Sequence, residues 1–176
     1  MALLEAAGIP HMVAGSFAST FHGVARATQD LDLVVDPAGA ALDTFLALLD
    51  PDVYYVDADT ARDALRRRSQ FNVIDMTTGW KADLIIRKAR PFSIGEFARR
   101  QPAELMGTRT YVATAEDSII SKLEWAKQSD SMRQLRDVAG IVAMRADALD
   151  LDYVERWVSA LALEVEWARV RAGDTT

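Results

Sequence analysis

The chain of 176 residues contains no cysteine, which excludes disulfides, zinc–thiolate sites and a cysteine nucleophile. Its histidines are only His11 and His22, so a histidine-rich metal site is also disfavoured. No uncharged apolar run approaches the ~18 residues that span a bilayer, and no secretory signal is recognisable near Met1. These features predict a cytoplasmic protein with no membrane partner.

Basic residues are in the minority, because 20 Lys and Arg stand against 26 Asp and Glu, for a formal net charge of −6. Coating of nucleic acid without sequence preference requires a basic surface, so the sequence predicts no non-specific DNA binding. The 50% hydrophobic and 26% charged fractions are typical of a folded globular protein. The chain is long enough for a substantial core but short for two full domains.

Short strand patterns alternate with helical patterns through the first two thirds of the chain, and the last third is helical. This order predicts an α+β fold, in which a mixed sheet flanked by helices occupies residues 1–113 and a helical subdomain over 114–176 packs on it. The strand patterns cover 11–14, 29–35, 53–56, 70–76, 80–87 and 109–112, and the helical patterns cover 2–7, 17–22, 40–49, 60–68, 94–100, 115–127, 132–144 and 153–169.

The strand predicted at 29–35 carries an unusual pair of acids. Alternate residues of a strand share a face, so Asp30 and Asp32 would lie about 7 Å apart on the side opposite Leu31 and Leu33. Two unpaired carboxylates this close repel each other, which implies a cation or neighbouring bases. The alternative is a half-exposed strand with an acidic outer face, although Asp is depleted in strands.

A third carboxylate strengthens the metal interpretation. Asp83 faces away from its apolar neighbours in a later strand, and if the two strands are adjacent, Asp30, Asp32 and Asp83 converge. With oxygen ligands alone, the expected metal is Mg²⁺ or Mn²⁺. Gly15 and Ser16, at a strand-to-helix turn, can offer backbone N–H groups to a phosphate. Metal carboxylates beside a phosphate site indicate phosphoryl or nucleotidyl transfer.

The spacing of these residues resembles a known signature. Gly-Ser at 15–16, thirteen intervening residues and Asp-Leu-Asp at 30–32 resemble the DNA polymerase beta-like nucleotidyltransferase superfamily, with Asp83 as its third carboxylate. The run Arg-x-Thr-x-Asp-x-Asp at 26–32 resembles the AbiEii-like abortive-infection toxin branch of minimal nucleotidyltransferases. The resemblance implies Mg²⁺-dependent transfer of a nucleoside monophosphate from an NTP to an acceptor hydroxyl, with Arg26 and Thr28 among the nucleotide-binding residues.

A second group of charged residues lies on two later helices. Lys122 projects within the apolar face of its helix, where it either extends its ammonium group to solvent or reaches a phosphate. Arg133 and Asp137 follow on the next helix, where a solvated face with local ion pairs is the ordinary interpretation. The resembling branch has a Lys on one helix and a base followed by Asp on the next. This implies that Lys122, Arg133 and Asp137 bind the nucleotide and that Lys122 assists catalysis.

The sequence leaves the acceptor and the biological role open. The basic run at 66–68 could meet an RNA backbone, or it could be a solvated helix end. The resemblance implies a toxin that modifies tRNA 3′ ends and has a separately encoded antitoxin. The alternatives are a catalytically inactive module that binds or regulates, and a small-molecule nucleotidyltransferase that modifies an antibiotic.

Overall fold

The computed structural model describes residues 1–24, 27–105 and 107–175. It divides into two compact units. Met1–Phe17 and Ala27–Val112 form the first, here called the sheet unit, and the described residues of Ala18–Arg26 and Ala113–Thr176 form the second, the helical unit. Residues 18–24 therefore belong with the helical unit, whereas the sequence places them in the first domain.

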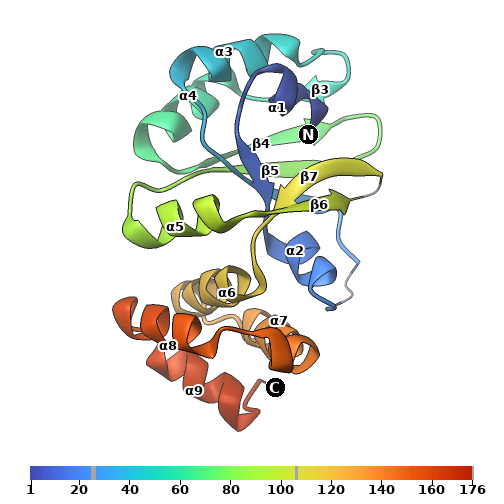
Figure 1. Cartoon of the computed structure of the whole chain (residues 1–176). Coiled ribbons are helices and arrows are strands. Elements are labelled where there is room, and N and C mark those ends of the chain that lie inside the picture. The colour runs from blue at the N-terminus through green and yellow to red at the C-terminus, as the bar shows by residue number, and fades with distance from the viewer. Residues whose placement is uncertain (25–26, 106, 176) are drawn as a thin grey trace. The chain divides into compact units, whose positions relative to one another are not determined.

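A seven-stranded mixed sheet forms the sheet unit, with strand order β3-β4-β5-β2-β1-β7-β6 (Figure 1). β2 pairs in parallel with β5, β1 pairs in parallel with β7, and the remaining neighbours are antiparallel. With the flanking helices and a helical C-terminal region, this confirms the predicted fold class. The strands are β1 (His11–Val13), β2 (Asp30–Val35), β3 (Tyr54–Tyr55), β4 (Gln70–Asp75), β5 (Lys81–Ile86), β6 (Gln101–Leu105) and β7 (Thr108–Val112).

Alternation along the central strands separates the core from the polar residues. Leu33 and Val35 of β2 and Leu84 and Ile86 of β5 are buried, at most 2% exposed. Both strands are polar where they begin and apolar where they end, so their first residues remain accessible while the last ones fill the core. The accessible end of this strand pair is where the acidic residues lie.

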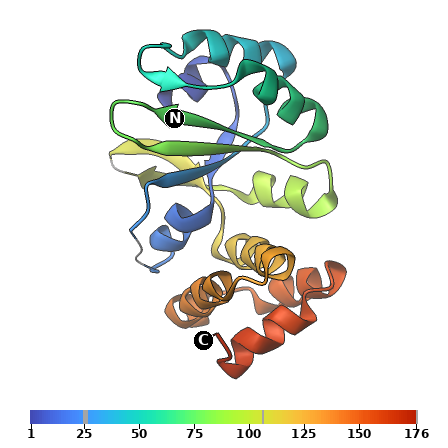
Figure 2. The ribbon, with the colours of Figure 1, turned by 180° about the vertical axis from the view of Figure 1, so that it is seen from behind.

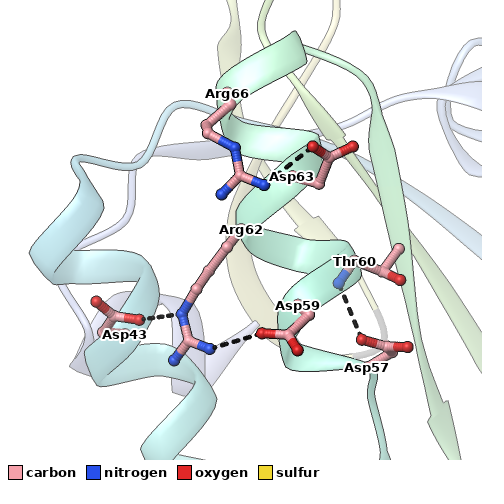
Figure 3. A network of polar contacts seen from close by, with 7 residues as sticks. All are labelled: Asp43, Asp57, Asp59, Thr60, Arg62, Asp63 and Arg66. Carbon is pink, nitrogen blue, oxygen red and sulfur yellow. Dashed lines mark hydrogen bonds and ion pairs between the residues drawn. The ribbon is translucent and has the colours of Figure 1, made fainter.

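Helix α1 (Ala2–Ala6) packs on α3 (Gly39–Leu48), and α3 packs on α4 (Ala58–Arg67). Helix α4 also packs on β4 (Figure 2). Asp57 caps α4 by accepting a hydrogen bond from the Thr60 N–H at 2.9 Å. Arg62 bridges Asp43 of α3 and Asp59 of α4, at 2.9 and 3.4 Å (Figure 3). These exposed ion pairs fix the side chains on the outer surface of the helix pair. α5 (Pro91–Arg99) also belongs to the sheet unit, whereas α2 (Gly15–Phe21) begins in the sheet unit and continues into residues assigned to the helical unit.

The helical unit is built on α6 (Ala115–Ser129) and α7 (Met132–Arg145), which pack along each other. Thr114 caps α6, because its hydroxyl accepts a hydrogen bond from the Asp117 N–H at 3.1 Å. A short 3₁₀ turn (Ala146–Ala148) leads into α8 (Leu151–Ala160) and α9 (Glu164–Ala172).

Two element predictions are wrong. The continuous helix predicted over 153–169 is two helices, because Ala162 adopts a left-handed φ of 55° that no α-helix accommodates, and its carbonyl accepts a hydrogen bond from Lys127 at 2.6 Å. The second error is an omission, because no strand was predicted over β6, which contains Pro102. Pro102 is tolerated because β6 is the edge strand of the sheet.

Within the described ranges, no helix combines the length and the apolar character needed to cross a membrane.

Candidate functional site

The carboxylates of the sheet unit lie on two adjacent strands, which is the condition on which the metal interpretation of the sequence depends. In the parallel pair β2–β5, Asp32 lies opposite Asp83, and Asp30 lies opposite Lys81. Asp30 and Asp32 are two residues apart and share a face. The side chain of Asp30 is 58% exposed and that of Asp83 is 18% exposed, so the group extends from solvent into the edge of the core.

Lys81 is the base that compensates this negative charge. Its Nζ lies 3.0 Å from an Asp83 carboxylate oxygen and 3.5 Å from an Asp30 oxygen. The hydrogen bond to Asp83, with the attraction of both carboxylates, raises the pKa of the Lys81 ammonium group. The charge repulsion that the sequence pattern predicts is therefore relieved by a lysine from the neighbouring strand.

Across residues 1–24, 27–105 and 107–175, no three His, Asp or Glu side chains are gathered closely enough to hold a metal ion as they stand. The donor chemistry nevertheless suits a hard divalent cation, because Asp30, Asp32 and Asp83 are all carboxylates on one pair of strands. Lys81 carries its ammonium group on a flexible four-carbon chain. Displacement of this one side chain would leave both Asp30 and Asp83 without their ammonium partner.

Gly15 brings the strand-to-helix turn directly against Asp32. Its φ of +57° lies in the left-handed region, and a Cβ at this position would overlap the Asp32 carboxylate. Both the backbone conformation and the close approach therefore require glycine. Ser16, the next residue, is 9% exposed at the start of α2. The structure thus brings the predicted phosphate-binding turn to the predicted metal residue.

The residues preceding β2 have a structural part in this site. The Thr28 hydroxyl accepts a hydrogen bond from the Asp30 N–H at 3.1 Å, which fixes the start of the acidic strand. Thr28 was predicted to bind the nucleotide, and in the structure its hydroxyl contacts the Asp30 backbone. Arg26, predicted for the same role, lies outside the described residues.

An aromatic pair at this end of the sheet was missed by sequence analysis. Phe17 of α2 and Trp80, which immediately precedes β5, have ring centroids 5.9 Å apart at an interplanar angle of 37°. Both residues are partly exposed. The sequence signal that was available is the position of Trp80 directly before Lys81 and of Phe17 directly after Ser16.

The residues predicted on the later helices form a separate cluster in the helical unit. Lys122 of α6 and Asp137 of α7 are 5% and 6% exposed, and their Nζ and Oδ2 atoms lie 2.8 Å apart. Lys122 also donates to the Gln134 side chain at 3.1 Å. Arg133, one position before Gln134, is exposed. The structure brings Lys122 and Asp137 together as a buried ion pair between the two helices and leaves Arg133 on the surface.

Several solved structures are similar to this chain. A nucleotidyltransferase-like antigenic protein from Paracoccidioides brasiliensis aligns with a TM-score of 0.58 and 15% identity, over 92% of this chain and 83% of its own. The antibiotic-resistance factor ANT(2″)-Ia aligns in its solution structure with a TM-score of 0.56 and 14% identity, over 98% of this chain and 91% of its own. The chain has the nucleotidyltransferase fold.

A crystal structure of ANT(2″)-Ia in complex with adenylyl-2″-tobramycin shows the same fold, with a TM-score of 0.53 and 14% identity over 97% of this chain and 92% of its own. No protein-family model matches the sequence, and a search of curated proteins also finds no match. The nucleotidyltransferase fold of this chain is therefore recognised through its structure.

Proposed function

We propose that the protein is a Mg²⁺- or Mn²⁺-dependent nucleotidyltransferase, which transfers a nucleoside monophosphate from an NTP to an acceptor hydroxyl. One observation carries this proposal: in a nucleotidyltransferase fold, Asp32 and Asp83 face each other on adjacent parallel strands, while a glycine turn contacts Asp32. The fold supplies the class of chemistry, and this arrangement of carboxylates supplies residues suited to it.

Each residue of the site has a part in this reaction. Asp30, Asp32 and Asp83 would hold the metal, which when bound neutralises negative charge on the triphosphate. Asp83 would accept the proton of the acceptor hydroxyl as the oxygen forms its bond to the α-phosphorus and the bond to the pyrophosphate leaving group breaks. Gly15, lacking a side chain, leaves room for phosphate oxygens to approach the backbone beside Asp32.

Lys81 provides the counter-charge before the metal binds. Its ammonium group contacts Asp30 and Asp83 at 3.5 and 3.0 Å and so holds the two carboxylates in place. With a divalent cation held by Asp30, Asp32 and Asp83, the flexible Lys81 side chain would be able to contact the triphosphate. We retain Arg26, Thr28, Lys122, Arg133 and Asp137 as predicted nucleotide-binding residues, of which Lys122 would compensate charge on the pyrophosphate.

Two acceptors are compatible with this chemistry. The toxin-like resemblance of residues 26–32 supports transfer to a tRNA 3′ end, with an antitoxin as partner and a cytoplasmic location. The likeness to ANT(2″)-Ia, solved with adenylyl-2″-tobramycin, supports a small-molecule acceptor as the second candidate. A cationic acceptor of that kind would be favoured by the overall charge of −6.

Incubation with each labelled NTP, Mg²⁺ and either total tRNA or tobramycin tests both acceptors. We expect label on one acceptor with the wild type and none with Asp32→Asn. Asp59→Asn is the matched control, because the Asp59 side chain is 99% exposed on α4. No labelling of either acceptor together with no NTP binding would favour the inactive binding module instead. Equal labelling by wild type and Asp32→Asn would contradict the role assigned to Asp32.

A further inference from the structure

A basic surface runs across the sheet unit of this acidic protein, and the nucleotidyl-transfer chemistry makes no use of it. Six cationic residues form it, here called the basic strip. They come from the end of α4, the loop between β5 and α5, and the residue after α5 (Figure 1). The basic strip consists of Arg66, Arg67, Arg68, Arg87, Lys88 and Arg100.

Specific contacts connect these segments, which are distant in sequence. Arg68 Nη1 donates a hydrogen bond of 2.7 Å to the Arg87 carbonyl oxygen, so the end of α4 is fixed beside the β5–α5 loop. Arg87 and Arg100 both lie over the ring of Phe97, with their Cζ atoms 6.0 and 4.3 Å from its centroid. Arg100 also lies 4.9 Å from the ring centroid of Tyr111, which is 45% exposed. The arginines therefore form one connected path.

The conformation of Arg68 supports a role for its charge. Arg68 has a left-handed φ of 50° at the end of α4, a position that favours glycine and costs other residues about 1–2 kcal/mol. Its side chain, directed to Arg87, joins the two basic segments. An arginine here is unfavourable for the backbone, and it places a guanidinium between the other charges of the strip.

Only part of this positive charge is compensated. Among the described residues, Asp63 pairs with Arg66 and Arg67 at 3.0 and 2.7 Å, and Asp36 pairs with Arg87 at 2.8 Å. The side chains of Arg66 and Arg67 nevertheless remain 68% and 75% exposed. Among these residues, the six cations of the basic strip thus have only two carboxylate partners, in a chain whose net charge is −6.

The part of the strip around Arg87 lies at the opposite end of β5 from the carboxylate site, whereas Arg100, before β6, is at the level of Asp32 along the strands but is separated from β2 by β1 and β7. β5 begins at Lys81, which contacts Asp83, and Arg87 follows its last residue. Six residues of extended strand separate Lys81 from Arg87 by about 20 Å. A ligand held by Arg67, Arg87 and Lys88 would therefore bind without contacting Asp83, so that this binding does not depend on the proposed transfer reaction.

From these observations we infer that the basic strip binds a single-stranded nucleic acid through its phosphate backbone. Five of the six cations are arginines, whose planar guanidinium groups match phosphate oxygens bidentately. Their path is extended, as a strand of regularly spaced phosphates requires. The exposed ring of Tyr111 beside Arg100 offers a face on which a base can stack. The acidity of the remaining surface restricts such binding to this strip.

Fluorescence anisotropy with a labelled 20-nucleotide single-stranded RNA, without NTP or metal, tests this inference. We expect binding with an affinity that falls as the salt concentration rises. Arg67→Gln with Lys88→Gln should reduce affinity at least about tenfold and lower the salt slope by about 1.4, for two lost phosphate contacts. Arg156→Gln with Arg171→Gln is the control with the same change of charge, placed in the helical unit, and it should bind like the wild type.

Three results would overturn the inference: no binding at low salt, equal weakening in both double variants, or competition by polyglutamate as effective as by unlabelled RNA. The last would indicate an acidic protein as the partner. Asp32→Asn should bind the RNA like the wild type, so that failure here is distinguishable from failure of the proposed transferase activity.

Discussion

Gly15 and Asp32 show how one residue can determine whether a site exists. The positive φ of Gly15 excludes most side chains, and the Asp32 carboxylate occupies the space a Cβ would need. Neither constraint can be read from the sequence, in which Gly-Ser is a common turn. The spacing to the Asp-x-Asp pattern indicates the turn, and the structure adds the contact that makes glycine necessary.

Gly15→Ala should impair both folding and activity. The left-handed backbone costs about 1–2 kcal/mol with a Cβ present, and displacement of Asp32 by about 1 Å should lower transfer about hundredfold. Urea unfolding and the labelling assay measure the two effects.

Gly79→Ala separates these causes, because Gly79 has a φ of +75° with nothing near its Cβ position. It should lose comparable stability and keep its activity. If both variants lose activity equally, the loss of activity in Gly15→Ala is not caused by a clash with Asp32.

His22 predicts a pH dependence of the helical unit. Its Nε2 lies 2.8 Å from the Ala113 carbonyl oxygen and therefore carries the proton, while its Nδ1 is buried and has no hydrogen-bond partner among residues 1–24, 27–105 and 107–175. Burial lowers the pKa of His22 from its ordinary value of 6.5, against the opposing effect of the Ala113 hydrogen bond. The unfolded chain thus binds this proton at a higher pH than the folded chain does.

The free energy of unfolding should therefore fall as the pH drops below about 6.5. In His22→Phe this part of the pH dependence should be absent, although the variant is less stable throughout. Urea unfolding at a series of pH values between neutral and mildly acidic measures the difference. An identical pH dependence of the two proteins would contradict the assignment.

Among the elements, α6 and α7 are joined by a buried ion pair whose role the sequence left open. Lys122 and Asp137 lie together at 2.8 Å and are almost fully buried. Such a pair contributes little compared with apolar residues, but removing one partner leaves a buried charge and costs about 3–5 kcal/mol. This structural role and the catalytic role predicted for Lys122 lead to different expectations.

Lys122→Met should destabilise the protein by about 3 kcal/mol or more in urea unfolding. Lys122→Met combined with Asp137→Leu should recover most of that loss, because no buried charge remains. If the double variant is stable and still transfers nucleotide, the pair is structural. A double variant that is stable but inactive would show that the pair contributes to the reaction.

Some elements can be predicted from the sequence more closely than others. Strands with clear alternation, such as β2 and β5, were predicted within one or two residues, because burial of one face imposes that pattern. The pairing of Asp32 with Asp83 could only be assumed, since strand order depends on the whole sheet. The break at Ala162 and the edge strand containing Pro102 were missed, because tertiary context overrides local preference at both places.

At the scale of the whole molecule, the placement of charge is more informative than its sum. The net charge of −6 describes neither the carboxylates compensated by Lys81 nor the basic strip on the same unit. The sequence predicted the acidic cluster through alternation. It left the run at 66–68 ambiguous, because the contact of Arg68 with Arg87 joins segments nineteen residues apart.

The central claim is that Asp30, Asp32 and Asp83 form a metal-dependent nucleotide site. Calorimetric titration of the protein with NTPs, in Mg²⁺ and in EDTA, tests it most directly. We predict binding of at least one NTP by the wild type in Mg²⁺, and none in EDTA or by Asp32→Asn, with Asp59→Asn unaffected. Binding that is unchanged by EDTA and by Asp32→Asn, or no binding of any NTP in Mg²⁺, would contradict the claim.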